Sequence, residues 1–144
     1  MTLRFPAAVA PFLLLLLPAF APAAELEVAV ERLRNARGDL HLCLTREPAH
    51  FPDCKGDPRS VSRTVPASTR SIRITGLAPG GYALSILHDE NRNRKLDTTL
   101  MIPREGFGFS RNPVVRFGAP KFRQVRIDLP AGFTRQTVRM QYLL

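Results

Sequence analysis

Hydrophobic and polar residues alternate with a period of two in several short stretches of the chain. This period places one set of side chains against a core and the other set towards solvent, as in a half-buried β-strand. One further stretch is apolar almost throughout, which is typical of a central strand buried on both faces. The predicted strands lie at residues 26–30, 40–44, 72–74, 83–87, 125–129 and 138–142.

Turn-forming residues separate these stretches, and no segment shows a sustained helical period. Glycine, proline, asparagine and aspartate gather at residues 35–38, 53–58, 79–81, 113 and 130–132. Short strands with turns at such intervals predict an all-β fold, a single antiparallel Greek-key β-sandwich of about seven strands. The segment Gly76–Tyr82, GLAPGGY, resembles turns of transthyretin-like (prealbumin-like) sandwiches. There we expect the Tyr82 hydroxyl to bond to nearby backbone.

One connection, from Asp89 to about Phe122, breaks the regular spacing. Loops of this length inside a compact domain are uncommon and usually functional. This one carries several large apolar side chains, including Phe107 and Phe109. We therefore expect it to pack as a long loop across one end of the sandwich.

The first 23 residues have the pattern of a secretory signal. Arg4 precedes the apolar run 12–17, and small residues at Ala21 and Ala23 fit a cleavage site. The apolar run is shorter than the roughly 20 residues of a transmembrane helix. We expect a single mature domain, residues 24–144, without a transmembrane segment and exported to the periplasm or the medium.

The chain has two cysteines, Cys43 and Cys54. In an exported protein a pair of this kind is expected to form a disulfide bond. A reactive thiol pair is the alternative, although the spacing is not that of a C-x-x-C motif.

Residues 89–97 carry oxygen-bearing side chains at the spacing of a calcium loop. In EF-hand loops the ligands stand at positions 1, 3, 5, 7 and 9, with position 7 contributing its backbone carbonyl. Counted from Asp89, these positions hold Asp89, Asn91, Asn93, Lys95 and Asp97. The spacing predicts a calcium site, with calcium as the one expected cofactor.

Two departures from the EF-hand pattern leave another interpretation open. Arg94 stands where a glycine makes the sharp turn, and Leu100 stands where a bidentate acid is expected. Glu105 would supply that acid if the loop folds back. The alternative is a turn in which the Asp and Asn side chains bond to their own backbone.

The same region resembles a bacterial exported family known only as a domain of unknown function, number 2141. The resemblance rests on HDENRNRKLDTT at 88–99, IPREGFGFSRN at 102–112 and the segment 120–122, in that order. The family pattern has glycine at the positions of Arg94 and Met101. Membership implies a secreted β-sandwich and no established activity.

Basic residues outnumber acidic ones, 21 to 12. Arg73, Arg126 and Arg139 fall in or beside predicted strands at outward positions, where a basic face would attract polyanions. For an exported protein these are lipid headgroups or anionic glycans of the envelope, and nucleic acid is an unexpected partner. Phe107 and Phe109 complete this candidate binding surface as a stacking platform, with core packing as the alternative.

No catalytic arrangement is evident. Ser110 is not part of a G-x-S-x-G motif, and we interpret His41 as a strand residue and His88 as bonded within the loop. The sequence favours a non-enzymatic exported β-sandwich with a calcium loop at 89–97. The alternative is an envelope-associated module that binds an anionic glycan or lipid headgroup through an arginine-rich sheet face.

Overall fold

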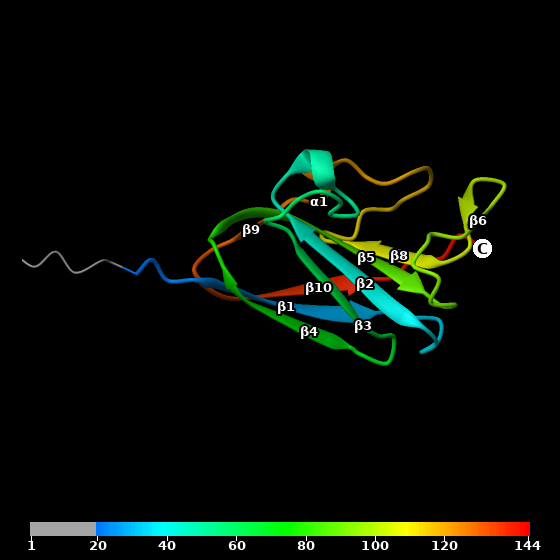
Figure 1. Cartoon of the computed structure of the whole chain (residues 1–144), viewed down its shortest axis with the longest axis horizontal. Coiled ribbons are helices and arrows are strands. Elements are labelled where there is room, and N and C mark those ends of the chain that lie inside the picture. The colour runs from blue at the N-terminus through cyan, green and yellow to red at the C-terminus, as the bar shows by residue number, and fades with distance from the viewer. Residues whose placement is uncertain (1–19) are drawn as a thin grey trace, which may run out of the picture.

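The computed structural model describes residues 20–144, which form two β-sheets packed face to face (Figure 1). Most of the predicted signal segment, 1–23, lies outside the described residues. The strands are β1 (Ala24–Glu31), β2 (Asp39–Thr45), β3 (Val61–Pro66), β4 (Ser71–Leu77), β5 (Gly80–Asp89), β6 (Thr98–Thr99), β7 (Ile102–Pro103), β8 (Gly106–Phe109), β9 (Ile127–Leu129) and β10 (Gly132–Arg139). Two short helical turns, η1 (Pro48–His50) and α1 (Phe122–Val125), complete the fold.

The smaller sheet has the strand order β10-β1-β4, and the larger has the order β3-β2-β5-β8, with β9 pairing with the start of β5. Strands β6 and β7 form a separate hairpin. The predicted all-β sandwich is confirmed. Among the strand pairs of residues 20–144, the β1–β10 pair is parallel and the others are antiparallel.

The main core lies between the two sheets. Leucines at alternate positions of β2 face inward, so that Leu40, Leu42 and Leu44 are each at most 2% exposed. Leu42 stands opposite Ile86 of β5 in the antiparallel register. At one end of the core the Tyr82 hydroxyl donates to the Ala78 carbonyl at 2.7 Å, as expected from the GLAPGGY turn.

A second, smaller core covers the outer face of the larger sheet. Segment 110–125 crosses this face and packs Val115 and Val125 against Phe107 and Phe109 of β8. Only the first part of the long connection, residues 90–105, therefore lies at the end of the sandwich (Figure 1). Residues 106–109 are a sheet strand rather than loop, because their backbone pairs with β5.

Two predicted strand boundaries were wrong, and an edge strand was missed. Val125 lies in the helical turn α1 instead of a strand, and β10 covers 132–139 instead of 138–142. The edge strand β3 was not predicted.

The cysteine prediction is confirmed, since Cys43 and Cys54 form a disulfide with a Cα–Cα distance of 5.6 Å. This bond ties β2 to the loop that follows it. Among the described residues, no helix is long and apolar enough to cross a membrane.

Candidate functional site

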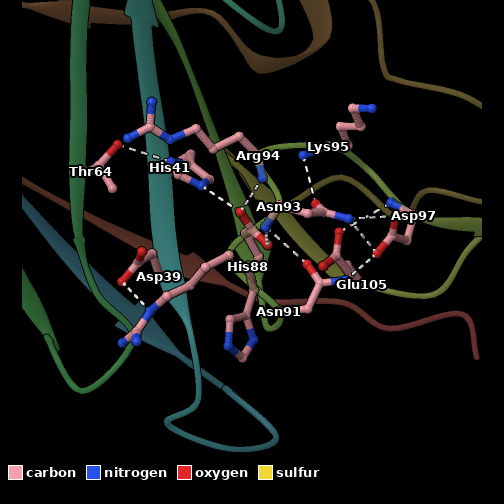
Figure 2. A network of polar contacts seen from close by, with 12 residues as sticks. Asp39, His41, Thr64, His88, Asn91, Asn93, Arg94, Lys95, Asp97 and Glu105 are labelled. Atoms are coloured by element: carbon pink, nitrogen blue, oxygen red, sulfur yellow. Dashed lines mark hydrogen bonds and ion pairs between the residues drawn. The ribbon is translucent and has the colours of Figure 1, made fainter.

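The predicted calcium loop begins where β5 ends and lies beside β2 (Figure 2). Its polar side chains meet two residues from other parts of the chain, His41 of β2 and Glu105 just before β8. The hairpin β6–β7 separates Asp97 from Glu105 in sequence and brings the two back together.

Asp89 is fully buried, and both of its carboxylate oxygens accept hydrogen bonds. His41 Nε2 lies 2.9 Å from Oδ2, and the backbone amides of Asn93 and Arg94 donate at 3.1 and 2.7 Å. Burial by itself raises the pKa of Asp89. The bonds from His41 and the two amides outweigh burial and hold the pKa below its ordinary value. Asp89 therefore fixes the start of the loop.

His41 was interpreted from the sequence as a strand residue without a site role. Its ring instead links Thr64 Oγ1, 2.9 Å from Nδ1, to the Asp89 carboxylate. The alternation of side chains along the two strands could have indicated this contact. His41 lies between inward leucines of β2, and Asp89 is an odd number of residues from the inward Ile86 of β5, so both side chains project from the outer face of the sheet.

The two asparagines close the loop around Asp97. Asn93 Nδ2 lies 2.9 Å from both Asp97 oxygens, and Asn91 Nδ2 lies 2.5 Å from Oδ2. Their amide oxygens accept the backbone N–H groups of Asn93 and Lys95, as in consecutive Asx turns. Each side-chain amide carries a donor nitrogen and an acceptor oxygen. A half-turn of either amide would bring its oxygen to the position facing Asp97.

Glu105 is the residue that distinguishes this loop from a simple turn. Its side chain is almost fully buried at 4% exposed, and Oε2 accepts the Asp97 amide at 3.1 Å. Oε1 is also buried, and within the described part of the chain it has no hydrogen-bond partner. Burial raises the pKa of Glu105, and the charges of Asp89 and Asp97 raise it further. The backbone amides of Asp97 and Glu90 lower the pKa but do not outweigh these effects.

A cavity of about 190 Å³ lies at this point. It is lined by Arg34, Glu90, Asn91, Asp97, Arg104 and Glu105. Glu90 is already neutralised by Arg34, whose guanidinium lies 2.6 Å away. The carboxylates at the cavity that have no ion-pair partner within residues 20–144 are therefore Asp97 and Glu105.

Across residues 20–144, no group of three His, Cys, Asp or Glu side chains is placed to hold a metal ion. A cation in this cavity would need amide or carbonyl oxygens in addition to the two carboxylates. Such a ligand set is all oxygen, which suits a hard cation.

His88 and Ser110 are structural in this fold. His88 is fully buried, with Nδ1 2.8 Å from the Tyr142 hydroxyl and Nε2 2.7 Å from the Arg37 carbonyl. The interpretation that it bonds within the loop was wrong, because its ring lies on the inner side of β5. Ser110 Oγ donates to the Val125 carbonyl at 2.5 Å and accepts the Leu84 amide at 3.1 Å.

The predicted stacking platform is also wrong. Phe107 and Phe109 are 7% and 5% exposed, because segment 110–125 covers them. Phe51 packs on Phe109 with ring centroids 5.8 Å apart. The alternative, that these rings are core, is the one the structure supports.

The three arginines do not form one basic face. Arg73 and Arg139 flank β1 on the smaller sheet and pair with Glu25 at 3.0 Å and Glu31 at 3.5 Å. Arg126 lies outside this sheet, just before β9, and pairs with Asp128 at 2.7 Å.

A scan against family models matched residues 28–137 to a family described as uncharacterized protein conserved in bacteria (DUF2141). No curated protein and no solved structure matches the chain. The match covers most of both sheets, the loop at 89–97 and Glu105. The chain therefore belongs to the DUF2141 family, whose members are uncharacterized bacterial proteins.

Proposed function

We propose that this protein is an exported, non-enzymatic β-sandwich that binds one calcium ion in the loop 89–105. The ligand oxygens come from Asn91, Asn93, Asp97, Glu105 and the backbone carbonyl of Lys95. Asp89 holds the loop start in place through its bonds to His41 and to backbone.

The observation that carries this proposal is the unpartnered oxygen of Glu105. A buried carboxylate oxygen without a donor costs free energy, and two nearby carboxylates add repulsion. Glu105 has both disadvantages, since Oε1 is orphaned and the charges of Asp89 and Asp97 raise its pKa. A cation between Asp97 and Glu105 would remove both.

Calcium fits the available ligands better than other common metals do. It takes six to eight oxygens in flexible geometry, whereas magnesium demands a near-ideal octahedron. Two carboxylates supported by amides and carbonyls correspond to the weaker calcium sites, with dissociation constants of about 10⁻⁴–10⁻³ M. This range suits a protein outside the cytoplasm.

The histidines and the serine that were considered as catalytic candidates support a non-enzymatic role. His41, His88 and Ser110 each use their polar atoms in hydrogen bonds that hold strands or loops together. His88 and Ser110 are in addition fully buried, so neither side chain is accessible to a substrate.

The test is thermal unfolding of the oxidised protein in calcium, in magnesium and in chelator. A ligand at ten times its dissociation constant stabilises the native state by about 1.4 kcal/mol. For a domain of this size that raises the midpoint by about 4–8 °C. We expect the rise in calcium and little in magnesium.

Asp97→Asn should abolish the rise, while Asp128→Asn serves as the matched control. Asp128 is an acid on β9 with a side chain 72% exposed, far from the loop in sequence. Equal midpoints in calcium and chelator for the unsubstituted protein, at calcium well above millimolar, would contradict the proposal.

A further inference from the structure

The hairpin β6–β7 presents large apolar side chains to solvent. Its two turn residues, Leu100 and Met101, are 91% and 93% exposed. Leu96 before the hairpin and Ile102 within it are 47% and 41% exposed. Figure 1 shows the hairpin projecting from the end of the sandwich, beyond the ends of the longer strands.

The backbone conformation at this tip is unfavourable for large side chains. Leu100 and Met101 have φ values of 51° and 67°, in the left-handed region at both central positions of the turn. Two-residue hairpins of this kind favour Asn-Gly, because bulky side chains are strained there. Two large apolar residues at a strained, exposed tip bury little surface within the described chain, and burial against a partner would give them a role.

The surroundings of the tip are basic. In segment 91–104 the charged side chains are Arg92, Arg94, Lys95, Asp97 and Arg104, four cations against one acid. All four cations are exposed. Within residues 20–144, neither Lys95 nor Arg104 forms an ion pair.

We propose that the hairpin 98–103 docks the protein on an anionic lipid bilayer. Leu100 and Met101 enter the boundary between headgroups and acyl chains, and Lys95 and Arg104 face the headgroup phosphates. Apolar insertion combined with basic residues is the usual requirement for binding at a membrane surface.

The hairpin is joined to the ion site at its base. The Arg104 amide donates to the Asp97 carbonyl at 2.9 Å, and the Asp97 amide donates to Glu105. A cation held by Asp97 and Glu105 would fix both ends of the hairpin and so strengthen docking. This coupling rests on the proposed function, whereas the docking itself rests on the tip and its charge.

The experiment is co-sedimentation of the protein with vesicles of phosphatidylglycerol and phosphatidylcholine, compared with phosphatidylcholine alone. The key variant is Leu100→Asn with Met101→Gly, which installs the residues the turn prefers and should fold at least as stably. We expect its partitioning to fall by about tenfold or more, because the buried apolar area is lost. Phe117→Ser is the control, since Phe117 is 96% exposed in a different loop.

Retention of binding in the control, with loss in the tip variant and weaker binding in high salt, would support docking. No sedimentation of the unsubstituted protein, or equal binding by the tip variant, would overturn it. Equal binding to vesicles of phosphatidylcholine alone would overturn the claim that the bilayer must be anionic. If the protein self-associates and the tip variant does not, the partner of the hairpin would be a second copy of the chain and not a bilayer.

The same assay in calcium and in chelator separates the two proposals. Binding strengthened by calcium and not in Glu105→Gln supports the coupling. Tip-dependent binding that is identical in both solutions supports docking and overturns the coupling. Calcium-dependent stability without vesicle binding overturns docking and leaves the ion site in place.

Discussion

Replacing Glu105 by glutamine should make the calcium-free protein more stable, although the substitution removes a native charge. In chelator, the ionised side chain of Glu105 is buried, lacks a donor at Oε1 and is repelled by Asp89 and Asp97. Glutamine has nearly the same shape and carries no charge, so it removes the repulsion from Asp89 and Asp97. The expected gain at neutral pH is about 1–2 kcal/mol, the usual cost of a buried polar group without a partner.

The pH dependence distinguishes this effect from a change in packing, because a packing change would alter stability equally at every pH. The folded-state pKa of Glu105 lies above the ordinary value of 4.5. The folded state binds the proton of Glu105 more tightly than the unfolded state does. The resulting contribution to the free energy of unfolding is fully present below the unfolded-state pKa and is lost as pH rises through the folded-state pKa. The stability difference between Glu105→Gln and the unsubstituted protein should therefore be small near pH 4 and should grow towards neutrality.

The assay is urea unfolding of both proteins in chelator across this pH range. The lowered pKa values of Asp57, Asp89 and Glu90 make both proteins lose stability as pH falls towards and below those values, so this loss cancels in the difference. A Glu105→Gln protein that is less stable than the unsubstituted one at neutral pH would refute the reasoning. A difference that does not change with pH would refute it equally.

Two further predictions concern residues that hold the loop 89–97, and a third concerns the disulfide. His41→Ala removes the one side-chain donor to Asp89 and should cost about 1–3 kcal/mol in urea unfolding at neutral pH, with the acid limb of the stability curve moved to higher pH. No change in either quantity would show that the ring does not brace Asp89. Gly38→Ala should cost about 2 kcal/mol or more by the same measurement, because its Cβ would stand 1.9 Å from the Asp89 carbonyl oxygen and its φ is 73°. An alanine variant of normal stability would contradict the close approach of residue 38 to the loop. Replacing Cys43 and Cys54 together by serine should lower the free energy of unfolding by about 2–4 kcal/mol, given the short loop the bond closes.

The alternation of apolar and polar residues predicted the strands that have one buried and one exposed face. It did not predict strands that are buried on both faces or only weakly buried. β8 reads GFGF and is buried at all four positions, because the inner core lies on one side and segment 110–125 on the other. Its pattern therefore has no polar phase to detect. β3 is an edge strand with two half-buried valines, Val61 and Val65, among polar residues, which is too weak a signal. A parallel pair such as β1–β10 has the same period as an antiparallel one, so the sequence pattern cannot distinguish them.

The candidate site was predictable in its local part. The spacing from Asp89 to Asp97 identified the loop, because those residues interact over a few positions of sequence. Glu105 was expected at the site only if the loop folds back, and it reaches Asp97 through the β6–β7 hairpin. His41 reaches Asp89 only through the β2–β5 register. These contacts depend on tertiary structure, and they decide which side chains point to the cavity.

The most direct measurement of the central claim is equilibrium dialysis of calcium against the unsubstituted protein and Glu105→Gln at neutral pH. The account predicts one ion per chain for the unsubstituted protein, with a dissociation constant of about 10⁻⁴–10⁻³ M. It predicts that Glu105→Gln binds at least about tenfold more weakly, a loss of about 1.4 kcal/mol. Equal calcium binding by the two proteins, or none by either, would contradict the assignment of Glu105 as a ligand.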